Sequence, residues 1–323
     1  MKKTVEKLRV GVIGTGYLGK FHAEKYARMN DVDLVGVVDV DSKQVREIAA
    51  HLKTEAYTDY RQILDKVDAV SVVVPTPAHY EVSKDFLNHD VDVLIEKPIT
   101  TTLDEADALI DIAESRGLLI QVGHLERFNP AVLALRGIIT KPMFIESHRL
   151  SIFKPRATDV SVVLDLMIHD IDIISNFTRS NLKSVHAAGI PVVSDQVDIA
   201  NARLEFQNGC VANVTASRIS TKNERKIRLF QRDAYISVDF ANHQITIIRQ
   251  DGKEPDSIIP GTSINQLNFT KADALDDELK SFVRSVKKRE VPEVSGPVGR
   301  KALEIALNVM DQINRTNRRF LSA

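Results

Sequence analysis

Residues 10–19 read Val-Gly-Val-Ile-Gly-Thr-Gly-Tyr-Leu-Gly, and this segment is the strongest indication of the fold in the chain. A β-branched run leads directly into glycines spaced G-x-G-x-x-G, and a stretch long enough for a helix follows. The first glycine allows a tight turn, the second lets a pyrophosphate approach the backbone, and the third lets the helix pack on the strand. Free N–H groups at the start of the helix favour an anion. We expect cofactor contacts from Gly14, Gly16, Tyr17, Leu18 and Gly19. The alternative is a glycine-rich turn that binds nothing.

Short runs of valine, isoleucine and leucine alternate with longer amphipathic stretches up to about residue 123. Such runs are typical of strands buried on both faces of a parallel sheet. We expect strands over residues 9–14, 34–39, 69–74, 91–96 and 118–122, and helices over 17–29, 42–51, 77–88 and 103–116. Thr102 and Glu105 form a capping box for the last of these helices, and Gly117 ends it. The alternation predicts an α/β fold with a doubly wound parallel sheet.

The pattern changes after about residue 124 and becomes extended from residue 183. We expect helices over 131–139, 160–177, 273–288 and 297–315, and strands over 143–152, 199–206, 211–217, 225–230, 234–240 and 244–249. Asn208-Gly209 predicts a type I′ hairpin, and Asp251-Gly252 predicts another turn. This half is expected to be an α+β domain with a mostly antiparallel sheet. The expected domains are therefore 1–124 and 125–323, and we allow for the last helix packing back on the first domain.

The composition excludes several classes of protein. A chain of 323 residues is long enough for two domains of about 150 residues each. The formal net charge is −1, which provides no electrostatic footprint for nucleic acid or an anionic membrane. The apolar runs are too short to span a membrane, and the first residues lack a signal-peptide cleavage pattern. Cys210 is the only cysteine, so no intrachain disulfide can form and we expect a cytoplasmic location.

Asp39 ends the second expected strand, 20 residues after Gly19. A carboxylate at this position hydrogen-bonds the ribose hydroxyls of adenosine and repels a 2′-phosphate. The sequence therefore favours NAD over NADP as the cofactor. The alternative is that Asp39 only caps the next helix, which Asp41 or Ser42 could do instead.

Two further segments end strands at the edge of the sheet where ligands bind in doubly wound folds. Thr76 and Pro77, with His79, follow the 69–74 strand, and Pro77 fits the first turn of a helix that Thr76 could cap. His79 is as compatible with a helix surface as with a cofactor contact. Glu96 and Lys97 end the 91–96 strand. A lysine there is a candidate proton carrier if its pKa is lowered, and otherwise it is a solvated loop residue.

Ionisable groups are concentrated in the apolar 160–177 segment. Asp165 and His169 are four residues apart and share one face of a helix, and Asp172 lies three residues further on. Charged groups are costly inside a core, so we expect them to line a cleft. His169 is then a candidate general base that Asp165 orients. A metal site is the rival interpretation, but no further histidine or cysteine completes a ligand set. A buried, hydrogen-bonded His–Asp pair is the structural alternative.

Together these segments resemble the glucose–fructose oxidoreductase, inositol dehydrogenase and MocA family, from Val10 to nearly the C-terminus. The resemblance rests on Gly14–Gly19 with His22, Thr76-Pro77 with His79, Glu96-Lys97-Pro98, Gly123 leading to Arg127-Phe128-Asn129-Pro130, and Asp165-x-x-x-His169 with Asp172. It implies a Rossmann domain, a second domain with a large open sheet, and a homodimer or homotetramer formed through that sheet. It also implies a nicotinamide cofactor and a sugar-type substrate. Lys97 and His169 then transfer the proton with Asp165 as their partner, and Arg127, Asn129 and Asp172 contact the substrate.

Residues 123–130 and 162–170 are similar to the branch of that family that oxidises C3 of UDP-N-acetylglucosamine. Many other members have glycines before the aspartate, whereas this chain has Val162-Val163-Leu164-Asp165. Lys154 and Arg156 are candidates for the pyrophosphate of such a substrate, or are ordinary surface charges. The alternatives are a dehydrogenase of inositol or a free sugar, an NAD-recycling glycosidase, and a non-catalytic sensor. The presence of both Lys97 and His169 speaks against the sensor.

Overall fold

The computed structural model describes residues 7–154, 159–250, 259, 261–269 and 272–321. The chain divides into two compact units. Unit 1 comprises Met1–Leu125 and Asp273–Lys301, and unit 2 comprises Glu126–Ala272 and Ala302–Ala323. The expected division at residue 124 did not assign residues 273–296 to the first domain, although it allowed for the last helix packing there. The packing of this segment, described below, accounts for the difference.

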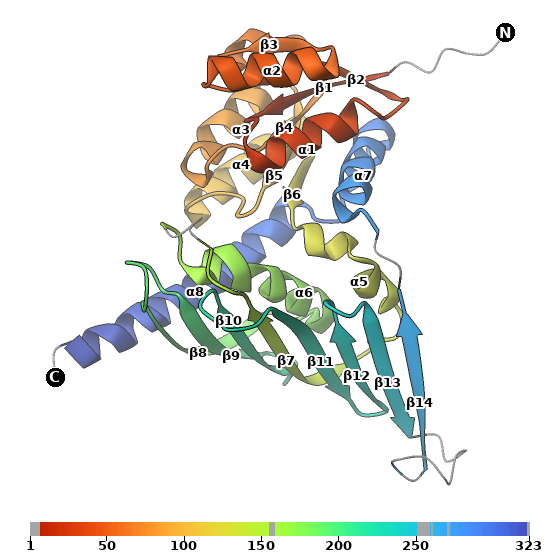
Figure 1. Cartoon of the computed structure of the whole chain (residues 1–323), viewed down its shortest axis with the longest axis vertical. Helices are drawn as coiled ribbons and strands as arrows, with labels where there is room; N and C mark the ends of the chain where they lie inside the picture. The colour runs from red at the N-terminus through yellow and green to blue at the C-terminus, as the bar shows by residue number, and fades with distance from the viewer. Residues whose placement is uncertain (1–6, 155–158, 251–258, 260, 270–271, 322–323) are drawn as a thin grey trace. The chain divides into compact units, whose positions relative to one another are not determined.

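Unit 1 is built on a six-stranded parallel sheet in the order β3-β2-β1-β4-β5-β6 (Figure 1). The strands are β1 (Leu8–Ile13), β2 (Val32–Val38), β3 (Glu55–Tyr57), β4 (Ala69–Val72), β5 (Asp92–Glu96) and β6 (Ile120–Gly123). The strand order reverses between β1 and β4, and this switch point is where doubly wound sheets bind ligands. The expected parallel sheet is confirmed. The three-residue β3 was not expected because it is too short to show a pattern.

The helices of unit 1 are α1 (Tyr17–Tyr26), α2 (Ser42–Leu52), α3 (His79–Asn88), α4 (Leu103–Arg116) and α7 (Ala274–Lys288). The capping box of Thr102 and Glu105 is confirmed, and Gly117 ends α4 with a φ of +65°. The α3 helix begins later than expected because Thr76–Ala78 form a separate 3₁₀ turn. Pro75, and not Thr76, is the residue before that turn, and no side chain caps it.

Residues 273–301 belong to unit 1 because α7 is strongly amphipathic. Its apolar side places Leu279, Phe282 and Val283 in the same core as Tyr26 of α1. A Cβ atom added at Gly299 would lie 2.4 Å from Val122, so the chain passes directly against β6 there. The segment therefore completes the core of unit 1, although it follows most of unit 2 in the sequence.

Unit 2 contains an eight-stranded sheet in the order β14-β13-β12-β11-β7-β10-β9-β8. The strands are β7 (Pro142–Leu150), β8 (Leu182–Ile190), β9 (Ile199–Phe206), β10 (Val211–Ser217), β11 (Glu224–Gln231), β12 (Ala234–Asp239), β13 (Gln244–Gln250) and β14 (Thr262–Asn268). Only β7 and β10 pair in parallel, and the other neighbours are antiparallel. The expected α+β class is confirmed. No strand was expected over β14, and β8 lies where the pattern was extended but no strand had been assigned.

Helices cover one face of this sheet: α5 (Pro130–Ala134), α6 (Ile168–Thr178) and the later part of α8 (Gly296–Leu321) (Figure 1). Ile171 and Ile174 of α6 and Val309 of α8 share a core with the strands. Along β9 the buried residues alternate with exposed or half-buried ones, as in a sheet with one covered face. Among the described residues, no helix is long and apolar enough to cross a membrane.

Two local expectations in unit 2 were wrong. The helix expected over 131–139 ends at Ala134, and Gly137 turns the chain with a φ of +80°. In the hairpin between β9 and β10, Gly209 has a φ of +87° but Asn208 does not have a positive φ. A type I′ turn needs positive φ at both residues, so this loop is instead a longer one closed by a left-handed glycine. The turn expected at Asp251-Gly252 lies outside the described residues.

Candidate active site

The three glycines after β1 meet different surroundings. A Cβ atom on Gly14, whose φ is +89°, would lie 2.4 Å from the carbonyl oxygen of Val73. One on Gly19 would lie 1.8 Å from the carbonyl oxygen of Gly14, whereas one on Gly16 would meet no protein atom within 4 Å. The first and third glycines are therefore required by the fold itself. The second faces open space, which fits the close approach of a pyrophosphate.

The N-terminus of α1 is suited to an anion. Gly16 is its N-cap residue, no side chain caps it, and its first turn has no acidic residue. The first N–H groups of a helix have no partner within the helix. Together with the helix dipole, they favour a phosphate group at this end of α1.

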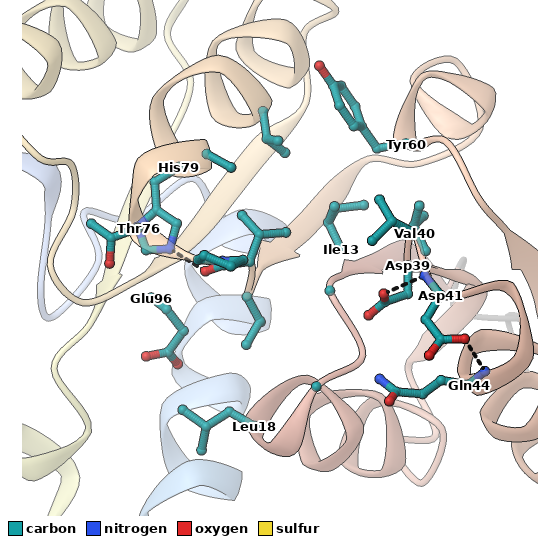
Figure 2. A pocket seen from close by; sticks show the side chains of 18 of the residues that line it. Ile13, Leu18, Asp39, Val40, Asp41, Gln44, Tyr60, Thr76, His79 and Glu96 are labelled. Carbon is teal, nitrogen blue, oxygen red and sulfur yellow. Dashed lines mark hydrogen bonds between the residues drawn. The ribbon is translucent and has the colours of Figure 1, made fainter. Parts of the chain in front are cut away.

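The glycine turn opens onto a cavity of about 960 Å³ within unit 1 (Figure 2). Nine of the residues expected at the cofactor line it: Gly14, Gly16, Tyr17, Leu18, Asp39, Thr76, His79, Glu96 and Lys97. Two do not line it. Gly19 is buried beneath the turn, and Pro77 is exposed and contributes to the 3₁₀ turn before α3. These nine residues thus lie at the carboxyl edge of the sheet, where folds of this kind bind NAD.

Asp39 is held by the glycine turn itself. Its carboxylate accepts hydrogen bonds from the N–H of Thr15 at 2.6 Å, the hydroxyl of Thr15 at 2.9 Å and the N–H of Asp41 at 3.0 Å. Asp41, and not Asp39, caps α2 by accepting from the N–H groups of Lys43 and Gln44. The capping alternative for Asp39 is therefore wrong. Asp39 is half-buried and lines the cavity, where its carboxylate can accept hydrogen bonds from a ribose.

Sequence reasoning missed Gln44, Tyr60 and Arg61 at this cavity. The side-chain amide of Gln44 donates to the carbonyl oxygen of Thr15 at 2.8 Å. The guanidinium of Arg61 lies 4.8 Å from the centre of the Tyr60 ring. Burial, with the hydrogen bond to Asp85 and the charge of that residue, raises the pKa of Tyr60 to about 12. Tyr60 and Arg61 follow β3, and no sequence signal marked that strand.

His79 is buried, with 1% of its surface exposed. Its ring nitrogens lie 2.9 Å from the carbonyl oxygens of Val74 and Pro98, which follow β4 and β5. Burial lowers the pKa of His79, although the carbonyls and Glu96 oppose this change. His79 is therefore not a helix-surface residue. It bridges the two loops at the switch point and so helps to hold the position of Lys97, which precedes Pro98.

Glu96 and Lys97 form a charged group at the end of β5. A Glu96 oxygen lies 3.2 Å from Nε2 of the buried His22, and the other accepts from the N–H of Lys97 at 3.3 Å. Burial alone would raise the pKa of Glu96, but His22 and the positive charges of Lys97 and His79 outweigh it and lower that pKa. A Cβ atom on Gly123 would lie 2.9 Å from the Glu96 carboxyl carbon, so the glycine makes room for it. Lys97 faces the cavity beside an ionised carboxylate.

In unit 2, the segment expected as one helix over 160–177 begins with a π-helical turn, Val163–Met167, followed by α6. Such turns are frequent at functional sites. The turn carries Asp165 and the first turn of α6 carries His169, and both are half-buried. Asp170 and Asp172 are almost fully buried. Only part of the acidic segment therefore faces a cleft.

The buried aspartates pair with arginines. Asp170 accepts from Nε of Arg149 at 2.6 Å and from the hydroxyl of Ser147 at 2.9 Å. Asp172 pairs with Arg127 at 3.4 Å, with 2% and 5% of their side chains exposed. Arg127 and Asp172 were expected to contact substrate. The structure pairs them with each other, because a buried charge on α6 needs an opposite charge beside it. Their contact with a substrate stays a prediction.

Asn129, also expected at the substrate, has a structural contact of its own. Its side-chain oxygen accepts from the N–H of Ala131 and caps α5, and its amide donates to Glu126 at 3.2 Å. Pro130 occupies the first turn of that helix. The Asn-Pro pair is therefore a helix-start signal.

A second cavity, of about 360 Å³, lies within unit 2. Asp165 and Lys154 line it, as do three arginines, Arg149, Arg218 and Arg225. Lys154 is exposed, whereas Arg156, the other residue expected at a pyrophosphate, lies outside the described residues. No group of three or more possible metal ligands occurs in the parts of the chain that the structure describes.

Comparison with known proteins connects these sites to a family. Residues 8–124 match an oxidoreductase family with an NAD-binding Rossmann fold, and residues 132–237 match the GFO/IDH/MocA C-terminal domain. The chain is 40% identical to the UDP-N-acetylglucosamine 3-dehydrogenase of Acidithiobacillus ferrooxidans, over 94% of this chain and 96% of that protein. It is 26% identical to the myo-inositol 2-dehydrogenase of Thermotoga maritima, over 92% and 93%.

Comparison with solved structures indicates the same family. The solved structure of the Acidithiobacillus ferrooxidans enzyme GnnA superposes with a TM-score of 0.91 at 39% identity, covering 95% of this chain and 97% of that one. The cavity of unit 1, its glycine turn and Asp39 are the features that an NAD-binding fold requires. The chain therefore belongs to the glucose–fructose oxidoreductase, inositol dehydrogenase and MocA family of NAD-dependent oxidoreductases.

Proposed function

We propose that this protein oxidises the C3 hydroxyl of UDP-N-acetylglucosamine to the 3-keto sugar nucleotide, with NAD as the oxidant. The observation that carries the proposal is the 40% identity, over nearly the whole of both chains, to an enzyme with that name. The inositol dehydrogenases it resembles are more distant, at 26–30% identity. The departure Val162-Val163-Leu164-Asp165 from the glycine-containing pattern of many other members supports the same choice.

Lys97, His169 and Asp165 supply the chemistry in this proposal. NAD, held at the glycine turn and by Asp39, would supply the acceptor for the hydride of C3. Lys97 and His169 carry the hydroxyl proton, and Asp165 orients His169. Removing the proton as the hydride leaves avoids a high-energy oxocarbenium species, which is the usual benefit of a placed base. Lys97 is suited to this work because it lines the cofactor cavity at the carboxyl end of β5.

The proposed cofactor preference is for NAD over NADP. The carboxylate of Asp39 lies in the cavity, and its two hydrogen bonds from Thr15 keep it at the glycine turn. Asp41 adds further negative charge to the same lining, whereas Asp59 pairs there with Arg61 at 3.4 Å. A 2′-phosphate would be repelled there.

The second domain is proposed to hold the substrate and to form a homodimer or homotetramer, in the cytoplasm. Lys154 lines the cavity that also contains Asp165, and we assign it, with Arg156, to the substrate pyrophosphate.

The proposed subunit interface is the sheet face away from the helices. There the ring centre of Phe230 lies 5.5 Å from that of Phe144 and 5.1 Å from that of Tyr235. An aromatic group on an uncovered sheet face suits an interface between subunits. Light scattering on the purified protein tests the oligomeric state.

The decisive test follows the nicotinamide absorbance when the protein meets NAD with UDP-N-acetylglucosamine, myo-inositol or free N-acetylglucosamine. We expect NADH from the sugar nucleotide alone, and none from Lys97→Ala or His169→Ala. NADH from myo-inositol would move the protein to another branch of the family. Release of free sugar without net NADH would identify an NAD-recycling glycosidase instead.

A further inference from the structure

Two arginines lie directly opposite each other in the sheet of unit 2. Arg225 on β11 and Arg149 on β7 are register partners. They share the covered face with Ile227 and Ile145, because side chains alternate along each strand. Like charges directly opposite each other destabilise a sheet. The pair therefore needs negative charge, either from the protein or from a ligand.

The positive charge of Arg149 is neutralised by carboxylates of the protein. Its guanidinium donates to Asp170 at 2.6 and 3.3 Å and to Glu126 at 3.0 Å, and 4% of its side chain is exposed. The charges of Asp170 and Glu126 more than offset burial and raise the pKa of Arg149 above its ordinary value. Arg149 is thus a structural residue, because each of its three guanidinium nitrogens already donates to a carboxylate.

Arg225 is different. It donates one hydrogen bond, at 3.3 Å, to the same Glu126 oxygen that Arg149 uses. Among the described residues, no other acceptor contacts its guanidinium, and 57% of its side chain is exposed. Glu126 thereby orients Arg225 while sharing its charge with a second arginine. The remaining N–H groups of Arg225 are available to a ligand in the cavity that it lines.

Two further donors flank Arg225 in that cavity. Lys154 contributes an ammonium group, and Asn223 uses its side-chain oxygen to accept from the N–H of Ile152 at 3.1 Å. Its amide N–H groups have no acceptor among the described residues. Glu224 also lines the cavity, but it pairs with Lys222 at 2.6 Å. Asp165 is the remaining carboxylate of the lining.

We propose that Arg225, oriented by Glu126, binds the diphosphate of the sugar nucleotide together with Lys154 and Asn223. This inference rests on the proposed function and identifies the group that distinguishes a sugar nucleotide from a free sugar. The planar guanidinium fork matches phosphate oxygens. The sugar then lies toward Asp165, which shares the cavity. Arg225 is therefore a specificity residue and Glu126 is its positioning residue.

The test compares Arg225→Met with Arg228→Met, a matched control on the same strand. Arg228 faces the opposite side of the sheet and pairs with Glu146. Calorimetry measures the binding of UDP and of uridine. We expect Arg225→Met to weaken UDP binding and raise the KM for UDP-N-acetylglucosamine about 10- to 100-fold. Uridine binding, NAD binding and the Tm should change little, because Arg149 keeps both of its carboxylates. Arg225→Lys should be intermediate, and Arg228→Met should resemble the wild type.

The outcomes separate this inference from the proposed function. If the wild type oxidises UDP-N-acetylglucosamine and Arg225→Met has an unchanged KM and unchanged UDP affinity, the inference is wrong and the function stands. If the wild type does not oxidise that substrate but binds UDP through Arg225, the function is wrong and the diphosphate site stands. Absence of UDP binding to the wild type overturns the site in either case.

Discussion

The cavities of the two units are built in different ways. In unit 1 the backbone forms the site, through a glycine turn, an uncapped helix N-terminus and strand ends. In unit 2 the site is made of charged side chains, and buried carboxylates neutralise Arg149 and Arg218. A backbone site needs only a few glycines at a fixed spacing. A side-chain site needs several distant strands to be in register. The first kind leaves a motif in the sequence, and the second does not.

The largest expected effect tests whether a side chain of unit 1, and not only its backbone, takes part in the reaction. Lys97→Met should reduce kcat by about 10²–10⁴-fold, the range for loss of a proton-transfer group. NAD binding should change little, because the glycine turn and Asp39 remain. Steady-state kinetics and a fluorescence titration with NAD measure the two quantities. A variant that loses NAD binding in proportion to activity would make Lys97 a binding residue instead.

The second prediction separates two glycines of the same turn. Gly19→Ala should lower the free energy of unfolding by about 3 kcal/mol, because its Cβ would collide with the backbone of Gly14. Gly16→Ala should alter it by less than about 0.5 kcal/mol, because its Cβ meets no protein atom.

Gly16→Ala should nevertheless weaken NAD binding at least about tenfold, by occupying the space of the pyrophosphate. Urea unfolding and NAD titration of both variants measure the contrast. Equal effects of the two substitutions on stability would show that Gly16 is also a packing residue.

The third prediction concerns the charge network of unit 2. Burial would raise the pKa of Glu126, but Arg149 and Arg225 outweigh it and lower the pKa below the ordinary 4.5. A lowered pKa in the folded state means that the carboxylate stabilises the fold above the unfolded pKa. This contribution is lost as the pH falls through the folded value. Glu126→Gln should therefore cost about 2 kcal/mol at pH 7.

The cost should shrink as the pH falls from about 4.5 through the lower pKa of the folded state, because the wild type is protonated over this range and loses the same charge. Urea unfolding across this pH range measures it. Glu146→Gln is the control, since Glu146 pairs with Arg228 at the surface and should cost less than about 1 kcal/mol. A difference that grows on acidification would contradict the assignment of Glu126 as an ionised partner of the arginines.

The smallest expected effect concerns Asp39, whose carboxylate accepts hydrogen bonds from Thr15 of the glycine turn. Asp39→Asn keeps an oxygen for the N–H of Thr15 but removes the charge that repels a 2′-phosphate. The preference for NAD over NADP, measured as the ratio of kcat/KM values, should fall about tenfold. Stability should hardly change. An unaltered ratio would assign cofactor choice to other residues of the lining, such as Arg61.

The sequence predicted the backbone features of unit 1 better than the charged side-chain contacts of unit 2. The strand–glycine–helix start, the capping box of Thr102 and the parallel sheet could be predicted because their causes act within a few residues. The position of Asp39 at the cavity could be predicted from its place at the end of the second strand, 20 residues after Gly19. Tyr60 and Arg61 could not be placed, because a three-residue strand carries them to the cavity edge. The proton-transfer roles of Lys97 and His169 remain predictions.

In unit 2 the sequence pattern predicted most of the strands and the apolar segment that carries Asp165. It assigned Arg127 and Asp172 to the substrate but did not predict that these two residues pair with each other inside unit 2. It did not single out Glu126 or Arg225, which are 99 residues apart along the chain. A charged residue looks the same in a sequence whether it faces a ligand or a buried partner.

The class of fold and the place of the NAD site were thus written in the sequence, because backbone dihedral angles, caps and glycine contacts are local requirements. The tertiary structure alone decided which charges neutralise one another and which remain for a ligand. The reason is physical: strand register sets Arg149 opposite Arg225, and packing decides that Asp172 is buried while Asp165 lines a cavity. Neither the strand register nor the burial of these aspartates produces a periodic pattern in the sequence.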